Sequence, residues 1–271
     1  MELSIVIVSF NAQADLERCL ASLVEHPPRA SHEIVVVDNA STDGSAAAAE
    51  RVQGVRVIRN ATNAGFSAAN NIGLRASTGR LILLLNSDTI VPPGAINGMI
   101  ERLERSPEVA VLGPRLIDGT GRAELSFGEM LTPWSEWRRQ RLMRRLAAND
   151  KETVAHVDAV TRIEQRPDWV TGACLLVRRA DAEAVGGLDE RYFMYTEDVD
   201  FCAAMRARGR AILFWPGVEI VHLRGRSGAT ASVATRAAYE RSHLAFYHKH
   251  HPVWAPVLAW LRRWSGSTAA L

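Results

Sequence analysis

Three carboxylates crowd a segment that is rich in aromatic residues. They are Glu197, Asp198 and Asp200, in the sequence DERYFMYTEDVDF at 189–201. Apolar surroundings and neighbouring like charges both raise the pKa of a carboxyl group, as a general base working near neutral pH requires. If the chain is helical from Glu197 onward, Asp198 and Phe201 share a face and Glu197 points elsewhere. Acids at a helix N-terminus can also serve the helix dipole alone, so catalysis and dipole stabilisation both stay open.

Another carboxylate, Asp88, follows the most apolar run of the chain. The sequence LILLLNSDT at 81–89 passes from five apolar residues directly to Asn86, Ser87 and Asp88. Such a run is typical of a strand that is buried on both faces. Ligands bind at the carboxyl ends of strands in open α/β sheets, so Asp88 could coordinate a metal or hold a polar ligand. A helix N-cap or a turn is the alternative role for this residue.

Polar residues follow two other apolar runs in the same way. They are Ser9 and Asn11 after the run at 4–8, and Asp38 and Asn39 after the run at 33–37. A parallel sheet would gather these side chains and Asp88 at one edge. A loop rich in Asn and Gly at 60–71 leads into a helix whose N-terminus could face an anion. No GxGxxG follows the first strand and no GxxxxGK[ST] occurs, which argues against a dinucleotide or P-loop site.

The first half of the chain alternates strands with helices. The expected strands are 4–8, 33–37, 55–59 and 81–85, and the expected helices are 15–24, 43–52 and 67–76. Continuously apolar strands in this alternation predict an α/β fold in which helices cover both faces of a parallel sheet. A helix is expected at 132–146, and the polar segment 147–166 is interpreted as a mobile loop of the kind that often forms a functional lid.

The second half is predicted to hold shorter elements. They are a strand at 169–177 with a bend at Thr171 and Gly172, a helix at 180–185, and strands at 211–215 and 219–221. His222, Arg224 and Arg226 then follow on a Gly-rich segment. An imidazole and two guanidinium groups there could close over a diphosphate and complete the ligand set of a metal. A purely structural histidine is the alternative.

Composition restricts the class of protein. A chain of 271 residues with 47% hydrophobic residues can bury a large core, and 30 of its 32 basic residues are arginine. Cys19, Cys174 and Cys202 are odd in number and their spacing matches neither a zinc site nor a disulfide framework, so a reducing cytoplasm is expected. The N-terminus has no basic leader, and no apolar run approaches the ~18 residues of a spanning helix. The protein is therefore expected to be neither exported nor integral to a membrane.

Seven motifs in order resemble glycosyltransferase family 2 over roughly residues 1–228. They are VSFN at 8–11, VVDNAS at 36–41, NAGFSAANNIG at 63–73, LLNSD at 84–88, TGA at 171–173, DERYFMYTEDVDFCAAMRARG at 189–209 and HLRGRSG at 222–228. Within the family, the chain is most similar to the bacterial rhamnosyltransferase branch. The resemblance implies a GT-A fold, which is Rossmann-like with a mixed, mostly parallel sheet. It also implies inverting transfer of a sugar, L-rhamnose from dTDP-rhamnose in this branch, to an acceptor hydroxyl in the assembly of cell-surface polysaccharide.

The resemblance also implies roles for individual residues. The donor would contact Ser9, Asn11, Asp38 and Asn39 through its nucleoside, Asn63, Gly65 and Phe66 in the adjoining loop, and Asn86, Ser87, Arg224 and Arg226. Asp88 and His222 would bind Mg²⁺ or Mn²⁺, and Asp198 would be the catalytic base with Glu197 as its neighbour. Asn86 departs from the family pattern, because it replaces the first acid of the DxD element. A site with one carboxylate could depend on donor phosphates to bind its ion.

The expected domain organisation follows the motifs. Residues 1–235 form a catalytic domain with a nucleotide-sugar half at 1–115 and an acceptor half at 116–235, and 236–271 form an amphipathic helical tail. The Trp and Arg residues of 132–146 and of the tail support the hypothesis of a cytoplasmic enzyme that touches the inner membrane leaflet to reach a lipid-linked saccharide. For 132–146 the alternative is a solvated arginine face on an ordinary helix, and for the tail it is packing on its own domain or in a homodimer. No nucleic-acid partner is expected.

Two other functions stay open. The donor could be UDP-GlcNAc or another UDP-hexose, or the fold could be an inactive scaffold that binds sugar nucleotides, an interpretation that Asn86 favours. A nucleotidyltransferase would need a basic Gly-rich loop after the first strand, which VSFNAQAD lacks. The QxxRW element of processive synthases is also absent, which favours the transfer of one sugar per encounter.

Overall fold

The first four strands form the parallel half of one eight-stranded sheet. The computed structural model describes residues 1–223 and 233–264, and in it β1 (Leu3–Ser9), β2 (His32–Asp38), β3 (Val55–Arg59) and β4 (Leu81–Asn86) lie in the order β3-β2-β1-β4. All three of these pairings are parallel. The strand predictions for this half are therefore confirmed. The apolar runs of β1, β2 and β4 are buried within the sheet as their composition requires, whereas β3 is a partly exposed edge strand.

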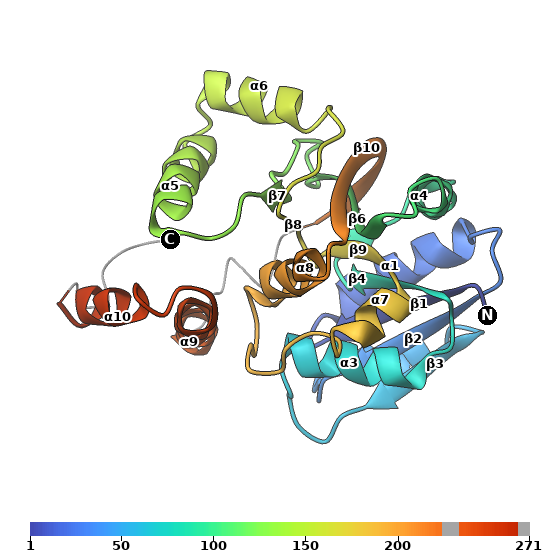
Figure 1. Cartoon of the computed structure of the whole chain (residues 1–271). Coiled ribbons are helices and arrows are strands. Elements are labelled where there is room, and N and C mark those ends of the chain that lie inside the picture. The colour runs from blue at the N-terminus through green and yellow to red at the C-terminus, as the bar shows by residue number, and fades with distance from the viewer. Residues whose placement is uncertain (224–232, 265–271) are drawn as a thin grey trace.

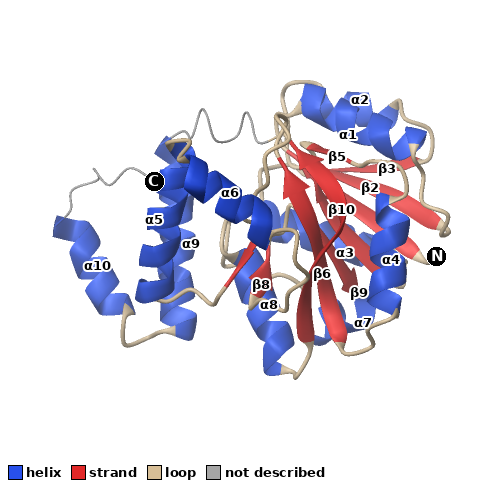
Figure 2. Ribbon diagram, turned by 90° about the horizontal axis from the view of Figure 1, so that it is seen from above, coloured by secondary structure: helices blue, strands red, loops and turns tan. Residues whose placement is uncertain are grey.

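Helices cover both faces of this sheet (Figure 2). Alternate residues of β1 point to opposite faces, so that Ile5 and Ile7 share a core with α1 (Gln13–Glu25) and α4 (Ala95–Glu104). Val6 faces the other side, where α3 (Phe66–Ala76) contributes Leu74 to a second core. The short α2 (Ser45–Glu50) packs beside α1 through its alanines.

The second half of the chain completes the sheet by a mixed pairing. The remaining order is β4-β9-β6-β10-β5, with β5 at Thr89–Ile90, β6 at Val109–Ile117, β9 at Cys174–Arg178 and β10 at Ala211–His222. β9 is antiparallel to both β4 and β6, whereas β10 is parallel to β6. The sheet is therefore mixed and mostly parallel, as the GT-A fold implies. A strand from the predicted acceptor half thus lies between two strands of the other half.

Two strand predictions need correction in their bounds. The run 169–177 divides at Thr171–Ala173 into β8 (Trp169–Val170), which pairs with β7 (Phe127–Gly128) in a small second sheet, and β9. Conversely, the segments 211–215 and 219–221 form the single strand β10, whose pairing with β6 is irregular between Trp215 and Glu219. A short helix, α7 (Arg179–Ala184), follows β9.

The interpretation of 147–166 as a mobile loop is wrong for its central part. Lys151–Val160 form helix α6, which follows α5 (Pro133–Ala147). The side chain of Asp150 caps α6 by accepting a hydrogen bond from the Thr153 N–H at 3.0 Å, and Asp158 of α6 pairs with the buried Arg115. Because a cap and an ion pair position α6 rather than an apolar stripe, its sequence lacks the periodicity that identifies most helices.

The last two helices lie beside α5, apart from the sheet (Figures 1 and 2). α9 (Val233–His250) packs on α5 through Glu136, which contacts His243 and Tyr247, and on α8 (Glu197–Ala207) through Asp200. α10 (Ala255–Trp264) follows after a short turn. Across residues 1–223 and 233–264, none of the helices is both long enough and apolar enough to span a bilayer.

Candidate active site

The carboxyl ends of β1, β2 and β4 meet at one edge of the sheet. Ser9 lies opposite Asp38 in the register, and Asn86 lies opposite Val8. The prediction that these polar strand ends gather is therefore confirmed. Ser9 and Asp38 are buried, and Ser9 Oγ and Asp38 Oδ1 have no hydrogen-bond partner among the residues that the structure describes. Buried polar atoms normally have partners, so these two atoms are suited to contact a ligand.

Three of the predicted donor-binding amides are occupied within the protein itself. Asn39 accepts a hydrogen bond from the Ala64 N–H at 3.0 Å and donates to Asn63 Oδ1 at 2.7 Å. Asn11 has a positive φ of 49° and accepts from the Thr42 N–H at 2.7 Å. The structure thus places these residues beside the edge, where they fix the loops that follow β2 and β3.

Gly65 joins the donor loop to the segment that precedes α8. Its φ is +86°, and a Cβ at this position would lie 2.5 Å from the Phe193 carbonyl oxygen. The same carbonyl accepts a hydrogen bond from the Phe66 N–H at 2.6 Å. Only glycine combines this backbone conformation with such a close approach. The loop 60–66 and the acidic segment are therefore in direct contact.

Substitution of Gly65 by alanine is expected to destabilise the fold and to raise the KM for the donor. The positive φ alone costs about 1–2 kcal/mol for an L-residue, and the overlap with Phe193 adds to it. Thermal unfolding and donor titration measure the two effects. Gly54→Ala is the matched control, because Gly54 has φ +82° and a Cβ there meets nothing within 4 Å. Equal effects of the two substitutions would show that the Phe193 contact is unimportant.

The two adjacent acids, Glu197 and Asp198, begin α8 and face different surroundings, as the helical spacing predicted. Tyr195 and Thr196 precede them with φ values of 72° and 67°, an uncommon pair of left-handed residues that turns the chain sharply into the helix. Asp198 Oδ2 accepts a hydrogen bond from the Gly172 N–H at 3.0 Å, and its Oδ1 accepts from the Val199 N–H at 2.8 Å. Asp198 is partly exposed, whereas Glu197 is buried.

Both pKa values are raised, as the sequence predicted for this cluster. Burial raises the pKa of Asp198, and the hydrogen bonds from Gly172 and Val199 oppose the rise only in part. Burial and the charge of Asp198 raise the pKa of Glu197 well above its ordinary value. Glu197 is therefore suited to hold a proton, and Asp198 is the acid that a substrate can reach.

Asp200, the third acid of the cluster, has a structural role. Its carboxylate accepts hydrogen bonds from Tyr192 Oη at 3.2 Å, Lys249 Nζ at 2.8 Å and His250 Nε2 at 2.6 Å. Burial alone would raise the pKa of Asp200, but the contacts with His250 and Lys249 outweigh it and lower the pKa. Asp200 thus anchors α9 to α8.

His222 and Asp88 meet at the same edge of the sheet. β10 pairs with β5 there, and His222 Nε2 lies 3.3 Å from Asp88 Oδ1. Its Nδ1 lies 3.1 Å from Glu124 Oε2, and the Asn86 amide nitrogen lies 3.5 Å from Nε2. Burial alone would lower the pKa of His222, but hydrogen bonds with Asp88 and Glu124 outweigh it and raise the pKa to about 9. Ser87 is partly buried and lies with Asp88 in the turn between β4 and β5.

These residues fit a divalent ion with an open coordination sphere. Two ligand atoms 3.3 Å apart can both contact one ion at about 2.0–2.3 Å, and a carboxylate on the far nitrogen is the usual support of a metal-bound histidine. Within residues 1–223 and 233–264, no group of three His, Cys, Asp or Glu side chains forms a metal cage. Any ion at Asp88 and His222 would therefore need water or substrate oxygens as further ligands. Arg224 and Arg226 lie outside the described residues.

Sequence reasoning missed two contributors to the site. Glu124 supports His222 across 98 positions of the chain, and the Phe193 carbonyl holds the donor loop. Glu124 belongs to no motif, and a backbone carbonyl carries no side-chain signal. Arg139 of α5, whose guanidinium lies over the Trp169 ring at 4.8 Å, was noticed only as part of a basic helix, yet its charge lowers the pKa of Asp198.

Comparisons with known proteins identify the family and the fold of this chain. The model of glycosyl transferase family 2 matches residues 4–163. The N-acetylglucosaminyl-diphospho-decaprenol L-rhamnosyltransferase of Mycobacterium tuberculosis is 31% identical over 97% of this chain and 90% of its own length. A Haloferax volcanii hexosyltransferase of low-salt glycan biosynthesis is 24% identical over 82% of this chain and 67% of its own.

Solved structures share the fold. The mannosyltransferase PcManGT from Pyrobaculum calidifontis, in complex with GDP-Man and Mn²⁺, is 20% identical and superposes with a TM-score of 0.64 over 95% of this chain and 68% of its own. GalNAc-T7 with UDP, GalNAc and Mn²⁺ gives a TM-score of 0.63 at 19% identity over 89% of this chain and 47% of its own. The fold is thus GT-A, and the match over more than half of the sequence places the chain in glycosyl transferase family 2.

Proposed function

We propose that the protein is an inverting rhamnosyltransferase that moves L-rhamnose from dTDP-rhamnose to a hydroxyl of a lipid-linked saccharide. The name of the mycobacterial relative supports both the sugar and the lipid-linked acceptor. The observation that carries the chemistry is the position of Asp198. This acid has a raised pKa, is partly exposed, and is held by Gly172 beside Phe66 of the donor loop.

The edge of the sheet is suited to bind the donor. Ser9 Oγ and Asp38 Oδ1 are the buried acceptor-capable atoms there that have no partner in the described part of the chain, and the thymine or uracil base of the donor offers one N–H group to such an atom. Asn39 and Asn63 would act indirectly by fixing the loop that ends at Phe66. We therefore assign the nucleoside to Ser9 and Asp38, and the sugar diphosphate to the side of Asp88.

Asp88 and His222 are the residues that would hold Mg²⁺ or Mn²⁺. Bound there, the ion would neutralise negative charge on the leaving diphosphate. The Mn²⁺ present in the two solved relatives is consistent with this assignment. Glu124 would keep the imidazole oriented with Nε2 toward Asp88, and Asn86 would lie beside the pair as a neutral group. Arg224 and Arg226 stay as predicted contacts of the diphosphate.

Asp198 would act as the general base. Its carboxylate would take the proton of the acceptor hydroxyl while that oxygen attacks the anomeric carbon from the face opposite the leaving group, which inverts the configuration. The transition state has oxocarbenium character, as in glycoside hydrolysis. Burial and the charge of Asp198 raise the pKa of Glu197, which disfavours a second negative charge next to Asp198. No covalent intermediate is needed for this reaction.

One screen tests the donor and separates the alternatives. Purified protein is incubated with Mn²⁺, a soluble saccharide diphosphate acceptor and dTDP-rhamnose, UDP-GlcNAc or UDP-galactose. Thermal unfolding is measured alongside release of the nucleoside diphosphate that leaves when the sugar is transferred to the acceptor. We expect dTDP-rhamnose to stabilise most, by roughly 2.7 kcal/mol at 100 times its Kd, and to be turned over. Stronger stabilisation and turnover with a UDP-sugar would identify that sugar nucleotide as the donor in place of dTDP-rhamnose. Stabilisation without any turnover would support the scaffold, which the presence of Asn86 favours.

A further inference from the structure

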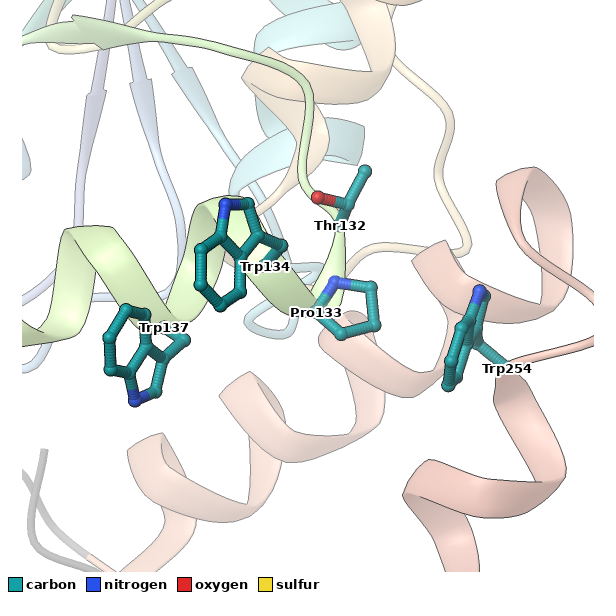
Figure 3. Close-up of a pocket in the computed structure, with 5 residues that line it drawn as sticks. All are labelled: Thr132, Pro133, Trp134, Trp137 and Trp254. Carbon is teal, nitrogen blue, oxygen red and sulfur yellow. The ribbon is translucent and has the colours of Figure 1, made fainter.

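Helix α5 exposes two tryptophans and has no buried residue. Trp134 and Trp137 are 63% and 48% exposed, and their rings stack with centroids 4.9 Å apart (Figure 3). Soluble proteins seldom leave stacked aromatic side chains exposed. Covering each ring removes a large apolar area from water, which is favourable. The stack is therefore a candidate contact surface.

The exposed tryptophans share one face of α5 with arginines. Relative to Trp134, the residues at spacings of three, four, seven, ten and eleven lie on the same side of an α-helix. This set, called the outer face of α5 below, consists of Trp134, Trp137, Arg138, Arg141, Arg144 and Arg145, all of which are exposed. The opposite side of the helix docks on the protein through Glu136 and Arg139.

An apolar groove extends this face toward the C-terminal helices. It is open, has a volume of about 590 Å³, and is lined by Thr132, Pro133, Trp134, Trp137 and Trp254. Figure 3 shows Pro133 between the ring of Trp134 and that of Trp254, which comes from the turn before α10. Val253, Val257 and Trp260 are exposed next to Trp254 along the chain. The apolar surface therefore spans two separate helices.

The charge on the outer face is only partly neutralised. Arg138 pairs with Glu129, and Arg145 pairs with Asp150 at 2.8 Å. Arg141 lies over the Trp137 ring at 5.9 Å, and neither it nor Arg144 forms an ion pair with a carboxylate of the described residues. A partner for this face must therefore supply negative charge next to apolar surface.

We propose that the outer face of α5, together with Trp254, docks on an anionic lipid bilayer. Tryptophan rings settle at the headgroup level, where one part is apolar and the other is wet, and arginines bind lipid phosphates. A second copy fits less well, because a two-fold interface would bring the same unpaired arginines from both chains together. The proposal deepens the proposed function, because a bilayer is where the enzyme would meet a lipid-linked acceptor. This biological reason for docking rests on the proposed function, whereas the docking itself does not.

Polar contacts join α5, the helix that carries the outer face, through α9 to α8, the helix that carries Asp198. Glu136 of α5 contacts His243 and Tyr247 of α9, and Lys249 and His250 of the same helix bind Asp200 of α8. Asp200 lies two residues after Asp198. A bilayer contact at α5 is therefore connected to the general base through one helix and two polar clusters.

Vesicle sedimentation of the full chain tests the proposal. The vesicles are either phosphatidylcholine alone or phosphatidylcholine with about a third phosphatidylglycerol, at low and at physiological salt. Two variants remove the surface: Trp134→Ala with Trp137→Ala, and Arg141→Glu with Arg144→Glu. The matched control is Arg105→Glu with Arg208→Glu, which changes the net charge equally at the exposed C-cap positions that follow α4 and α8. Circular dichroism and transfer to a soluble acceptor confirm that each variant is folded.

We expect the wild type and the control to bind the anionic vesicles, more weakly as salt rises, and to bind neutral vesicles poorly. Each surface variant should bind at least about tenfold more weakly. The arginine variant loses two residues that each contribute roughly a fivefold factor near an anionic surface, and the tryptophan variant loses both rings that settle at the headgroup level. No binding of the wild type at low salt, or an equal loss in the control, would overturn the proposal. So would a wild-type dimer in solution that the tryptophan variant dissociates. If the wild type transfers no sugar to a soluble acceptor, that result would instead count against the proposed function.

Discussion

Asp198→Asn is expected to lower turnover by roughly 10²- to 10⁴-fold, the range attributed to a positioned general base, with little change in donor affinity. The amide keeps the size of the side chain and can still accept the hydrogen bond from Gly172 or Val199. The amide cannot take the proton of the hydroxyl that attacks the sugar. Single-turnover transfer measures the chemical step, and calorimetric titration with the donor measures binding. Turnover within threefold of the wild type would exclude Asp198 as the base.

The pH profile separates Asp198 from its neighbour Glu197. A general base works when deprotonated, so the rate should fall as pH drops through the pKa of Asp198, which burial raises above the ordinary value. Asp198→Asn should abolish this acid limb. Glu197→Gln is the matched control, because it makes the same replacement in the adjacent buried acid, whose pKa is raised by burial and by the charge of Asp198. We expect the control to keep the acid limb. Its loss in the control alone would reverse the two roles.

Asp88→Asn is expected to cut turnover by about 10²-fold or more and to raise the Mn²⁺ concentration needed for half-maximal activity. Asp88 and His222 are the two proposed protein ligands of the ion, so losing the carboxylate removes the one that carries a negative charge. Electron paramagnetic resonance of Mn²⁺, with dTDP present, measures ion binding independently of transfer. Wild-type protein treated with EDTA should lose activity and regain it on adding Mn²⁺.

Glu124→Gln provides the graded comparison for that experiment. It leaves both proposed ligands in place and removes the carboxylate that faces His222 Nδ1. Loss of such a supporting carboxylate typically weakens metal affinity by about 10- to 100-fold. We expect the variant to lie between the wild type and Asp88→Asn in Mn²⁺ affinity. An unchanged Mn²⁺ titration in Asp88→Asn, or full activity after EDTA, would contradict the metal assignment.

The sequence predicted the parts of the fold that are set by local pattern. The apolar runs of β1, β2 and β4 identify buried strands wherever they lie, and α1 has a clear apolar stripe. The position of β9 depends on which distant strands it pairs with, and its sequence does not encode that choice. The helix α6 was missed because a capping aspartate and an ion pair position it.

The candidate site also contains residues that local sequence pattern predicts and residues whose roles depend on distant parts of the chain. Ser9, Asp38 and Asn86 could be placed from the sequence, because parallel strands bring their carboxyl ends to one edge. The different surroundings of Glu197 and Asp198 followed from helical spacing. Asp200 was grouped with them because its partners, Lys249 and His250, lie on a helix some 50 residues away. Glu124 was missed for the same reason.

The insertion of β9 between β4 and β6 has a consequence for synthesis of the protein. β4 and β6 are complete when the ribosome has passed residue 117, yet the strand that joins them ends at Arg178. At about 5–20 residues per second, the intervening stretch of roughly 60 residues takes about 3–12 s to make. During this interval two apolar strands present open edges that can pair with other chains. The nascent protein therefore exposes these edges until residues 174–178 emerge and pair with them.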